Sequence, residues 1–145
     1  MDKTVKTSNK IFKGLIFMII VILILGLALY AYNKSKEKQA IELIENTASK
    51  VFNASVEYSK NSNRIIVEKY LENEKELYEL TKTSLPKLSP IGDYDIVDLL
   101  SVRAYYGESK DDFQFYDIAF KDINKIRWET IKNFDDFLNE ISRFK

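Results

Sequence analysis

An uninterrupted apolar stretch, Leu15–Tyr32, constrains the structure of this chain more than any other feature. Its 18 residues contain no charge and no amide, and their hydroxyls are those of Tyr30 and Tyr32. As a helix the stretch would measure about 27 Å, close to the roughly 30 Å hydrocarbon core of a bilayer. Each central aliphatic residue favours membrane insertion by roughly 0.3–0.6 kcal/mol, which together outweighs the single Gly26. The stretch therefore predicts a transmembrane helix over residues 15–32.

Charged and aromatic side chains flank this stretch on both sides. Residues 1–14 form a short basic head that carries four lysines, and Lys13 is the last of them. Tyr30, Tyr32 and Lys34 follow at the other end of the stretch. Aromatic and basic side chains of this kind sit at the level of the lipid headgroups. We therefore predict that these four residues lie at the membrane interface.

The orientation of the chain in the membrane is less strongly indicated. Lysines precede and follow the apolar stretch in nearly equal number, so the positive-inside rule decides little. A short head with four lysines is a poor candidate for translocation. We therefore expect the N-terminus in the cytoplasm and the rest of the chain outside the inner membrane, with the opposite orientation as the alternative.

Two other interpretations of the apolar stretch remain open. The triplet Gly26-Leu27-Ala28 has the small residues of a signal-peptidase site, but the apolar run continues through Leu29–Tyr32, which favours an uncleaved anchor. Lys13-Gly14 before a long apolar helix has the outline of a prepilin processing site. Pilins generally place a glutamate a few residues later, where this chain has Ile19. A pilin-like subunit is therefore an alternative rather than the first interpretation.

Composition excludes several kinds of chemistry. The 145-residue chain has no histidine and no cysteine, so disulfides, Cys or His zinc sites and histidine-dependent triads cannot form. Residues 34–145 carry 18 Lys and Arg against 21 Asp and Glu, a mildly acidic balance that argues against nucleic acid as a partner. We expect no enzymatic activity, no cofactor and no metal site. The richness in Lys, Ile, Asn and Tyr suggests an AT-rich bacterial or phage genome.

The remainder of the chain shows helical spacing, which predicts an all-α fold. Over residues 33–83 apolar side chains recur every three or four positions, first from Ile41 to Tyr58 and then, out of phase, from Ile66 to Leu80. The phase shift indicates a break near residues 59–63. The segment is therefore expected to form either one long membrane-proximal helix or a helical hairpin.

Residues 84–93 contain both prolines and a glycine, which predicts a loop. In residues 94–145 we expect a short helix near 94–106 that ends at Gly107. A long amphipathic helix near 110–143 is expected to follow, because its apolar residues keep three-four spacing for four heptads. Such a face requires a partner helix, within a small bundle or in a coiled coil with another chain.

Three aromatic residues are candidates for contacts with a partner: Tyr105, Tyr106 and Trp128. Aromatic side chains are favoured at binding hot spots, although each could equally belong to a core. The layout, without any shared motif, is similar to that of small single-pass proteins of bacterial envelopes. We therefore expect a structural or protein-interaction component of a membrane complex, whose partners are the lipid bilayer, other envelope proteins or further copies of the chain. The alternative, a ligand-sensing helical bundle, would require a small-molecule pocket lined by Tyr105, Tyr106 and Phe115.

Overall fold

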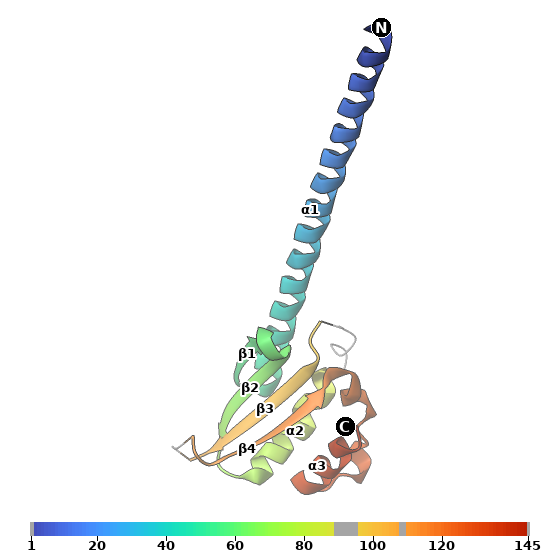
Figure 1. Cartoon of the computed structure of the whole chain (residues 1–145). Helices are drawn as coiled ribbons and strands as arrows, with labels where there is room; N and C mark the ends of the chain where they lie inside the picture. The colour runs from blue at the N-terminus through green and yellow to red at the C-terminus, as the bar shows by residue number, and fades with distance from the viewer. Residues whose placement is uncertain (1, 89–95, 108–109, 145) are drawn as a thin grey trace. The chain divides into compact units, whose positions relative to one another are not determined.

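The computed structural model describes residues 2–88, 96–107 and 110–144, with side chains from residue 14 onward. The chain divides into two compact units, Met1–Lys38 and Gln39–Lys145. The first unit consists of the beginning of helix α1 (Asp2–Phe52), and the second contains the end of this helix together with all the other elements (Figure 1).

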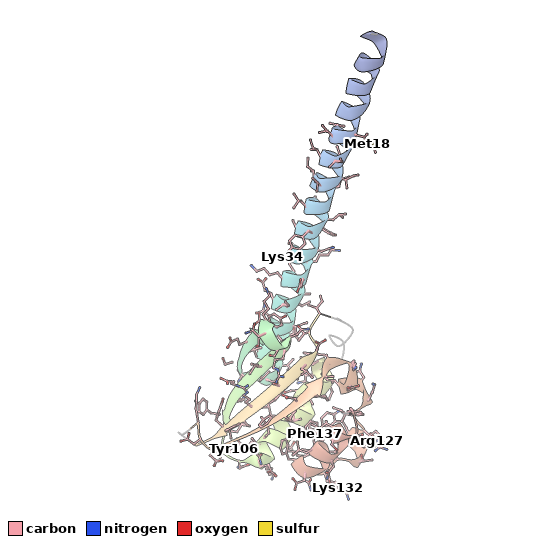
Figure 2. All side chains as sticks on the ribbon, in the orientation of Figure 1. Met18, Lys34, Tyr106, Arg127, Lys132 and Phe137 are labelled. Carbon is pink, nitrogen blue, oxygen red and sulfur yellow. The ribbon has the colours of Figure 1, made fainter. Side chains whose placement is uncertain are left out.

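Helix α1 includes the apolar stretch. Among the described residues it is the one helix long and apolar enough to cross a membrane, and its most apolar window has a mean hydropathy of 2.9. None of that window is buried against the protein, and side chains such as Met18 point outward around the helix (Figure 2). The segment is therefore a candidate membrane anchor or signal segment, as its sequence predicts.

A four-stranded mixed sheet forms the centre of the second unit. The strands lie side by side in chain order, with β1 antiparallel to β2, β2 parallel to β3, and β3 antiparallel to β4. The parallel pair is connected through helix α2 (Glu74–Leu88). The strands are β1 (Ser55–Ser59), β2 (Arg64–Leu71), β3 (Leu99–Tyr106) and β4 (Phe113–Ala119).

Short helical segments follow the sheet. The 3-10 helices η3 (Phe120–Lys125) and η4 (Trp128–Thr130) lead into helix α3 (Phe134–Ser142). Asn133 caps α3, because its side chain accepts a hydrogen bond from the N–H of Asp136 at 2.8 Å.

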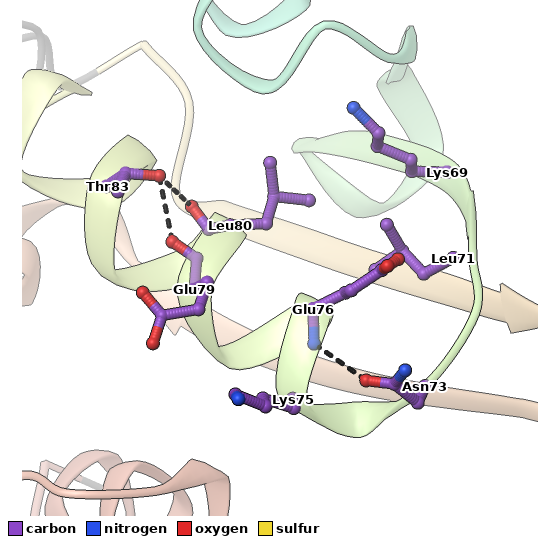
Figure 3. A pocket seen from close by; sticks show the side chains of 8 residues that line it. All are labelled: Lys69, Leu71, Asn73, Lys75, Glu76, Glu79, Leu80 and Thr83. Carbon is purple, nitrogen blue, oxygen red and sulfur yellow. Dashed lines mark hydrogen bonds between the residues drawn. The ribbon is translucent and has the colours of Figure 1, made fainter.

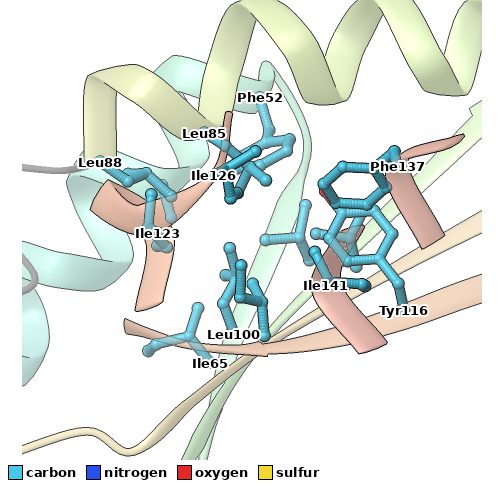
Figure 4. Close-up of a cluster of buried hydrophobic side chains, with 14 of the residues drawn as sticks. Phe52, Ile65, Leu85, Leu88, Leu100, Tyr116, Ile123, Ile126, Phe137 and Ile141 are labelled. Carbon is cyan, nitrogen blue, oxygen red and sulfur yellow. The ribbon is translucent and has the colours of Figure 1, made fainter. Parts of the chain in front are cut away.

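The core lies on one face of the sheet, because alternate strand residues point to the same side. Ile65, Leu100 and Tyr116 come from three neighbouring strands and are buried together (Figure 4). The core also takes Phe52 from α1, Leu85 and Leu88 from α2, and Phe137 and Ile141 from α3. One face of the sheet is thus covered by parts of all three helices.

The end of α1 packs into this core. Ile44, Ala48 and Phe52 are buried at four-residue intervals, as expected for one face of a helix. The helix stops at Asn53, whose φ of 46° lies in the left-handed region. The chain then turns directly into β1.

The all-α prediction is wrong, since the second unit combines helices with a mixed sheet. The helical pattern of residues 33–83 is correct as far as Phe52 and again in α2, but β1 and β2 lie between them. The break near residues 59–63 is present as the 3-10 helix η1 (Lys60–Ser62), which connects two antiparallel strands instead of two helices.

The C-terminal half differs further from the prediction. The loop expected over residues 84–93 begins later, because α2 continues through Pro86 to Leu88, and residues 89–93 lie outside the described part. Strand β3 replaces the helix expected near 94–106. β4, η3, η4 and α3 replace the helix expected near 110–143, so no long amphipathic helix and no coiled-coil seam occupies those residues.

Candidate functional site

The candidate site lies on the face of the sheet that points away from the core. Its aromatic side chains come from three neighbouring strands at one end of the sheet: Tyr70 on β2, Tyr105 on β3, and Phe113 and Phe115 on β4. The exposed fractions are 55% for Tyr70, 47% for Phe113 and 59% for Phe115, whereas Tyr105 between them is buried. We call these four residues the aromatic face.

The four rings of the aromatic face form a continuous row. The ring centroids of Tyr70 and Tyr105 are 5.4 Å apart, those of Tyr105 and Phe113 6.0 Å, and those of Phe113 and Phe115 6.1 Å. The row follows from strand register, because Tyr70 pairs with Tyr105 and Tyr105 with Phe113. Aromatic pairs at such distances stabilise one another beyond the area that they bury.

Two cations and one carboxylate accompany the rings. The Nζ atom of Lys110 lies 5.3 Å from the centroid of the Tyr105 ring. The Glu68 Oε1 atom accepts a hydrogen bond of 2.9 Å from the Tyr105 hydroxyl and lies 3.5 Å from the Arg103 guanidinium. The carboxylate of Glu68, by accepting this bond, raises the pKa of Tyr105 and keeps the phenol neutral.

A shallow cleft of about 380 Å³ opens among these side chains. Arg103, Tyr105, Lys110, Phe113 and Phe115 line it. Two of the lining side chains, Arg103 and Lys110, are cationic, and Arg103 also pairs with Glu68. The cleft combines ring surfaces for apolar groups with cations for an anionic group.

A second and larger hollow, of about 640 Å³, lies between the end of β2 and α2 (Figure 3). Its polar side chains already hold the fold together. Lys69 donates hydrogen bonds to the carbonyls of Phe52 and Asn53, and Asn73 accepts one from the N–H of Glu76 at 3.1 Å. This hollow is therefore the weaker candidate for a binding site.

The structure separates the two neighbouring tyrosines that the sequence singles out. Tyr105 belongs to the aromatic face, whereas Tyr106 points to the core side, where its hydroxyl donates to Gln114 Oε1 at 2.7 Å. Burial, together with the carboxylates of Glu74 and Asp112, raises the pKa of Tyr106 to about 12. Contact with a partner through either tyrosine remains a prediction.

Trp128 packs against the core. Its ring stacks on Phe137 with the centroids 5.8 Å apart and an interplanar angle of 11°, and the side chain is partly buried. Of the two roles considered for Trp128, the structure therefore supports a core residue.

The residues expected at the membrane interface lie on α1. Tyr30, Tyr32 and Lys34 are exposed, and the Lys36 Nζ atom lies 4.7 Å from the centroid of the Tyr32 ring. The side chain of Lys13 lies outside the described residues.

Sequence reasoning missed most of the site. It identifies Tyr105 and, for the sensor alternative, Phe115 as site residues, but not Tyr70, Arg103 or Phe113. The available signal was the density of aromatic and β-branched residues in segments 64–71, 99–106 and 113–119, which is typical of strands. Among the described residues no group of three or more Asp, Glu, His or Cys could hold a metal ion.

The side chains of the aromatic face and its cleft can make two kinds of contact. Exposed rings beside flexible cations can bury apolar groups and pair with an anion. Comparison with family models, with curated proteins and with solved structures gives no match to this chain.

Proposed function

We propose that the chain is a single-pass membrane protein whose second unit binds another protein through the aromatic face. In this proposal the stretch 15–32 stays in the inner membrane, residues 1–14 lie in the cytoplasm, and the folded unit lies outside. The proposal assigns no catalytic role and no cofactor. The proposal keeps the interaction role expected from the sequence, but it assigns this role to the aromatic face of the sheet instead of to contacts between helices.

Exposure of the aromatic face is the observation that carries the binding role. Three of the four rings in the row have about half of their surface open to solvent, and the fourth, Tyr105, lies between two of them. Contiguous apolar patches of this kind mark interaction sites, and aromatic side chains with a neighbouring arginine are typical of binding hot spots. Most other apolar side chains of these strands are buried in the core or packed against it, and Ile66 and Leu99 are half-buried on the same outward face as the rings. The exposed rings point away from the core and are not required to fill it.

Site-specific photo-cross-linking in intact cells tests the binding role. A benzoylphenylalanine at position 115 replaces one exposed ring by another and should form a covalent adduct with a protein. The same probe at Glu57, an exposed position on the same face of β1, is the matched control and should form none. Absence of an adduct at position 115, or equal adducts at both positions, would contradict the proposal.

A small-ligand sensor is the second candidate, because the cleft includes Tyr105 and Phe115 and its 380 Å³ falls within the usual size range of ligand sites. Aromatic carboxylates are the matching probes, since they offer a ring to the aromatic face and an anion to Arg103 and Lys110. A rise in melting temperature with such compounds, lost in Arg103→Gln, together with no protein adduct at position 115, would favour the sensor.

A further inference from the structure

Two arginines of the described strands lie on the face of the sheet that points away from the core, and they are held differently. Arg64 on β2 donates a hydrogen bond of 3.1 Å to Ser101 Oγ and lies 3.4 Å from Asp117 Oδ2. Arg103 on β3 lies 3.5 Å from Glu68 Oε1. Hydrogen bonds between a guanidinium and a carboxylate usually measure about 2.7–2.9 Å. Arg103, with its long contact, is therefore the more loosely held of the two.

Glu68 does not depend on Arg103 for a partner. Its Oε1 atom accepts a shorter hydrogen bond, 2.9 Å, from the Tyr105 hydroxyl. The Arg103 side chain is 39% exposed and that of Glu68 34%, and ion pairs with this degree of exposure contribute little to stability. The Arg103 guanidinium can therefore turn to another anion at little cost, while the Glu68 carboxylate keeps its bond to Tyr105.

A partner that covers the aromatic face also encloses Arg103. Arg103 pairs with Phe115 on the neighbouring strand, and both side chains line the cleft. A guanidinium carries five N–H donors and no acceptor, and a covering partner removes water from those donors. Enclosing a cation in this way is strongly unfavourable unless an anion takes the place of the water. Glu68 meets this need poorly, because its Oε1 atom also serves Tyr105 and lies 3.5 Å from the guanidinium.

We infer that the protein bound by the aromatic face presents a side-chain carboxylate to Arg103, and that Glu68 occupies the place of this carboxylate in the free chain. The inference rests on the proposed function and names the chemistry of its partner. A carboxylate accepts two parallel hydrogen bonds from a guanidinium, which a backbone carbonyl does not. The rings of Phe113 and Phe115 in the same cleft suit an apolar side chain next to that carboxylate.

Lys110, the second cation of the cleft, is less suited to this role. Its ammonium lies 5.3 Å from the centroid of the Tyr105 ring, and Asp111 and Asp112 follow it directly in the chain. An ammonium also cannot form the paired, planar bonds that a guanidinium forms with a carboxylate. Selection of an acidic partner is therefore assigned to Arg103.

The photo-probe at position 115 tests the inference in intact cells, because Phe115 pairs with Arg103 across the strands. At low expression of the full-length chain, Arg103→Gln should lower the yield of adduct roughly tenfold, the loss expected for one charged hydrogen-bonded contact. Arg103→Lys keeps the charge without the paired bonds and should lower the yield less. Arg64→Gln is the matched control on the same face and should leave the yield unchanged.

Glu68→Gln tests the exchange of partners. The amide removes the competing charge and keeps an oxygen that accepts the bond from the Tyr105 hydroxyl. The yield of adduct should rise by up to about fivefold, the equivalent of an exposed ion pair. In the Arg103→Gln background the same change should have no effect, because no guanidinium remains to be released. A merely structural role of Glu68 would instead lower the yield in both backgrounds and would overturn the exchange.

The partner's carboxylate is tested on the adduct itself. Mass spectrometry should locate the cross-linked segment of the partner and find an Asp or Glu beside the cross-linked residue. Replacing that carboxylate by the amide should lower the yield with the natural chain but not with Arg103→Gln, since the two changes remove the same contact. Equal losses with both chains would contradict a contact between the two groups.

The outcomes separate this inference from the proposed function. If the natural chain gives an adduct whose yield Arg103→Gln does not lower, or which Arg64→Gln lowers equally, the inference is wrong and the binding role stands. If the photo-probe gives no adduct at all, both fail. A rise in melting temperature with aromatic carboxylates would then assign Arg103 to the small-ligand sensor.

Discussion

Glu140 is a buried carboxylate on which two arginines converge. Its side chain is 6% exposed, and it accepts hydrogen bonds of 3.0 Å from the Nε and Nη2 atoms of Arg127 and one of 2.8 Å from Arg143. The backbone N–H of Arg127 adds a longer bond. The contact holds the segment before η4 against α3, so one carboxylate fixes two parts of the C-terminal region.

Removing both arginines should destabilise the second unit. Arg127→Gln with Arg143→Gln leaves the carboxylate buried without a cationic partner, and such a loss costs roughly 3 kcal/mol in the free energy of unfolding. Adding Glu140→Gln should recover part of that loss, because the amide needs no cation. Urea denaturation of the full-length chain in detergent, followed by circular dichroism, measures the effect. A triple variant no more stable than the double variant would contradict this account.

Tyr106 should make the stability of the second unit fall at high pH. Its pKa is raised from 10.0 to about 12, so between these values the unfolded chain has lost a proton that the folded chain keeps. The contribution of Tyr106 to stability is therefore complete below pH 10 and is lost as pH rises towards 12. The slope should be less than about 1.4 kcal/mol per pH unit, because solvent still reaches part of the side chain.

Tyr106→Phe isolates this contribution. The variant loses the hydrogen bond to Gln114 and should be less stable than the natural chain at pH 9 by about 1 kcal/mol. The difference should shrink at pH 11, where the natural chain has lost part of the contribution and the variant has none to lose. Urea denaturation at both pH values measures it, and a difference independent of pH would exclude this role of Tyr106.

At the scale of elements, the junction between α1 and β1 depends on one left-handed residue and one lysine. Asn53 has a φ of 46°, which ends the helix and turns the chain into β1. The Lys69 ammonium of β2 donates to the carbonyls of Phe52 and Asn53 at 2.9 and 3.0 Å. It thereby satisfies acceptors that have no partner at a helix C-terminus and complements the helix dipole.

Substitutions at Asn53 should separate conformation from side-chain chemistry. Asn53→Val places a β-branched residue in the left-handed region and should lower the free energy of unfolding by roughly 1–2 kcal/mol. Asn53→Gly should be neutral or slightly stabilising, because glycine adopts this conformation without strain. Thermal denaturation of the two variants beside the natural chain measures the difference. Equal losses for both would mean that the asparagine side chain, not its backbone, is needed.

Secondary structure was predictable from the sequence where an element has one buried face and one solvent-exposed face. Ile44 and Ala48 lie on such a stripe, and the helical conformation of this part of α1 is predicted correctly from it. The point at which the helix ends is not, because the expected stripe continues to Tyr58, which lies in β1. β4 was not predicted as a strand, because it has apolar residues on both faces. Phe113 and Phe115 lie on the face that points away from the core, and Tyr116 and Ile118 lie on the core face. Residues from both faces of the strand together imitate helical spacing. The aromatic face as a whole was missed because its residues are distant in the sequence and are brought together only by the register of three strands.

At the scale of the whole molecule, the two units have opposite surface chemistry. The second unit has its own core, and most of its large apolar side chains are buried in it. In the first unit every described large apolar side chain is exposed, from Leu15 to Tyr32. Such a surface is unfavourable in water, so the helix is expected to be covered by lipid.

Arginines in the middle of the apolar stretch should release the chain from the membrane. Each arginine near the helix centre costs roughly 2.5–3.5 kcal/mol of insertion free energy, so Ile22→Arg with Leu25→Arg outweighs the gain from the aliphatic residues. The natural chain should stay in the membrane pellet after alkaline extraction, and the double variant should become soluble. Leu43→Arg is the matched control, because Leu43 is an exposed α1 residue of the second unit, beyond the apolar stretch. It should stay in the pellet. A natural chain that alkali extracts, or whose intact mass shows cleavage after Ala28, would exclude an uncleaved anchor.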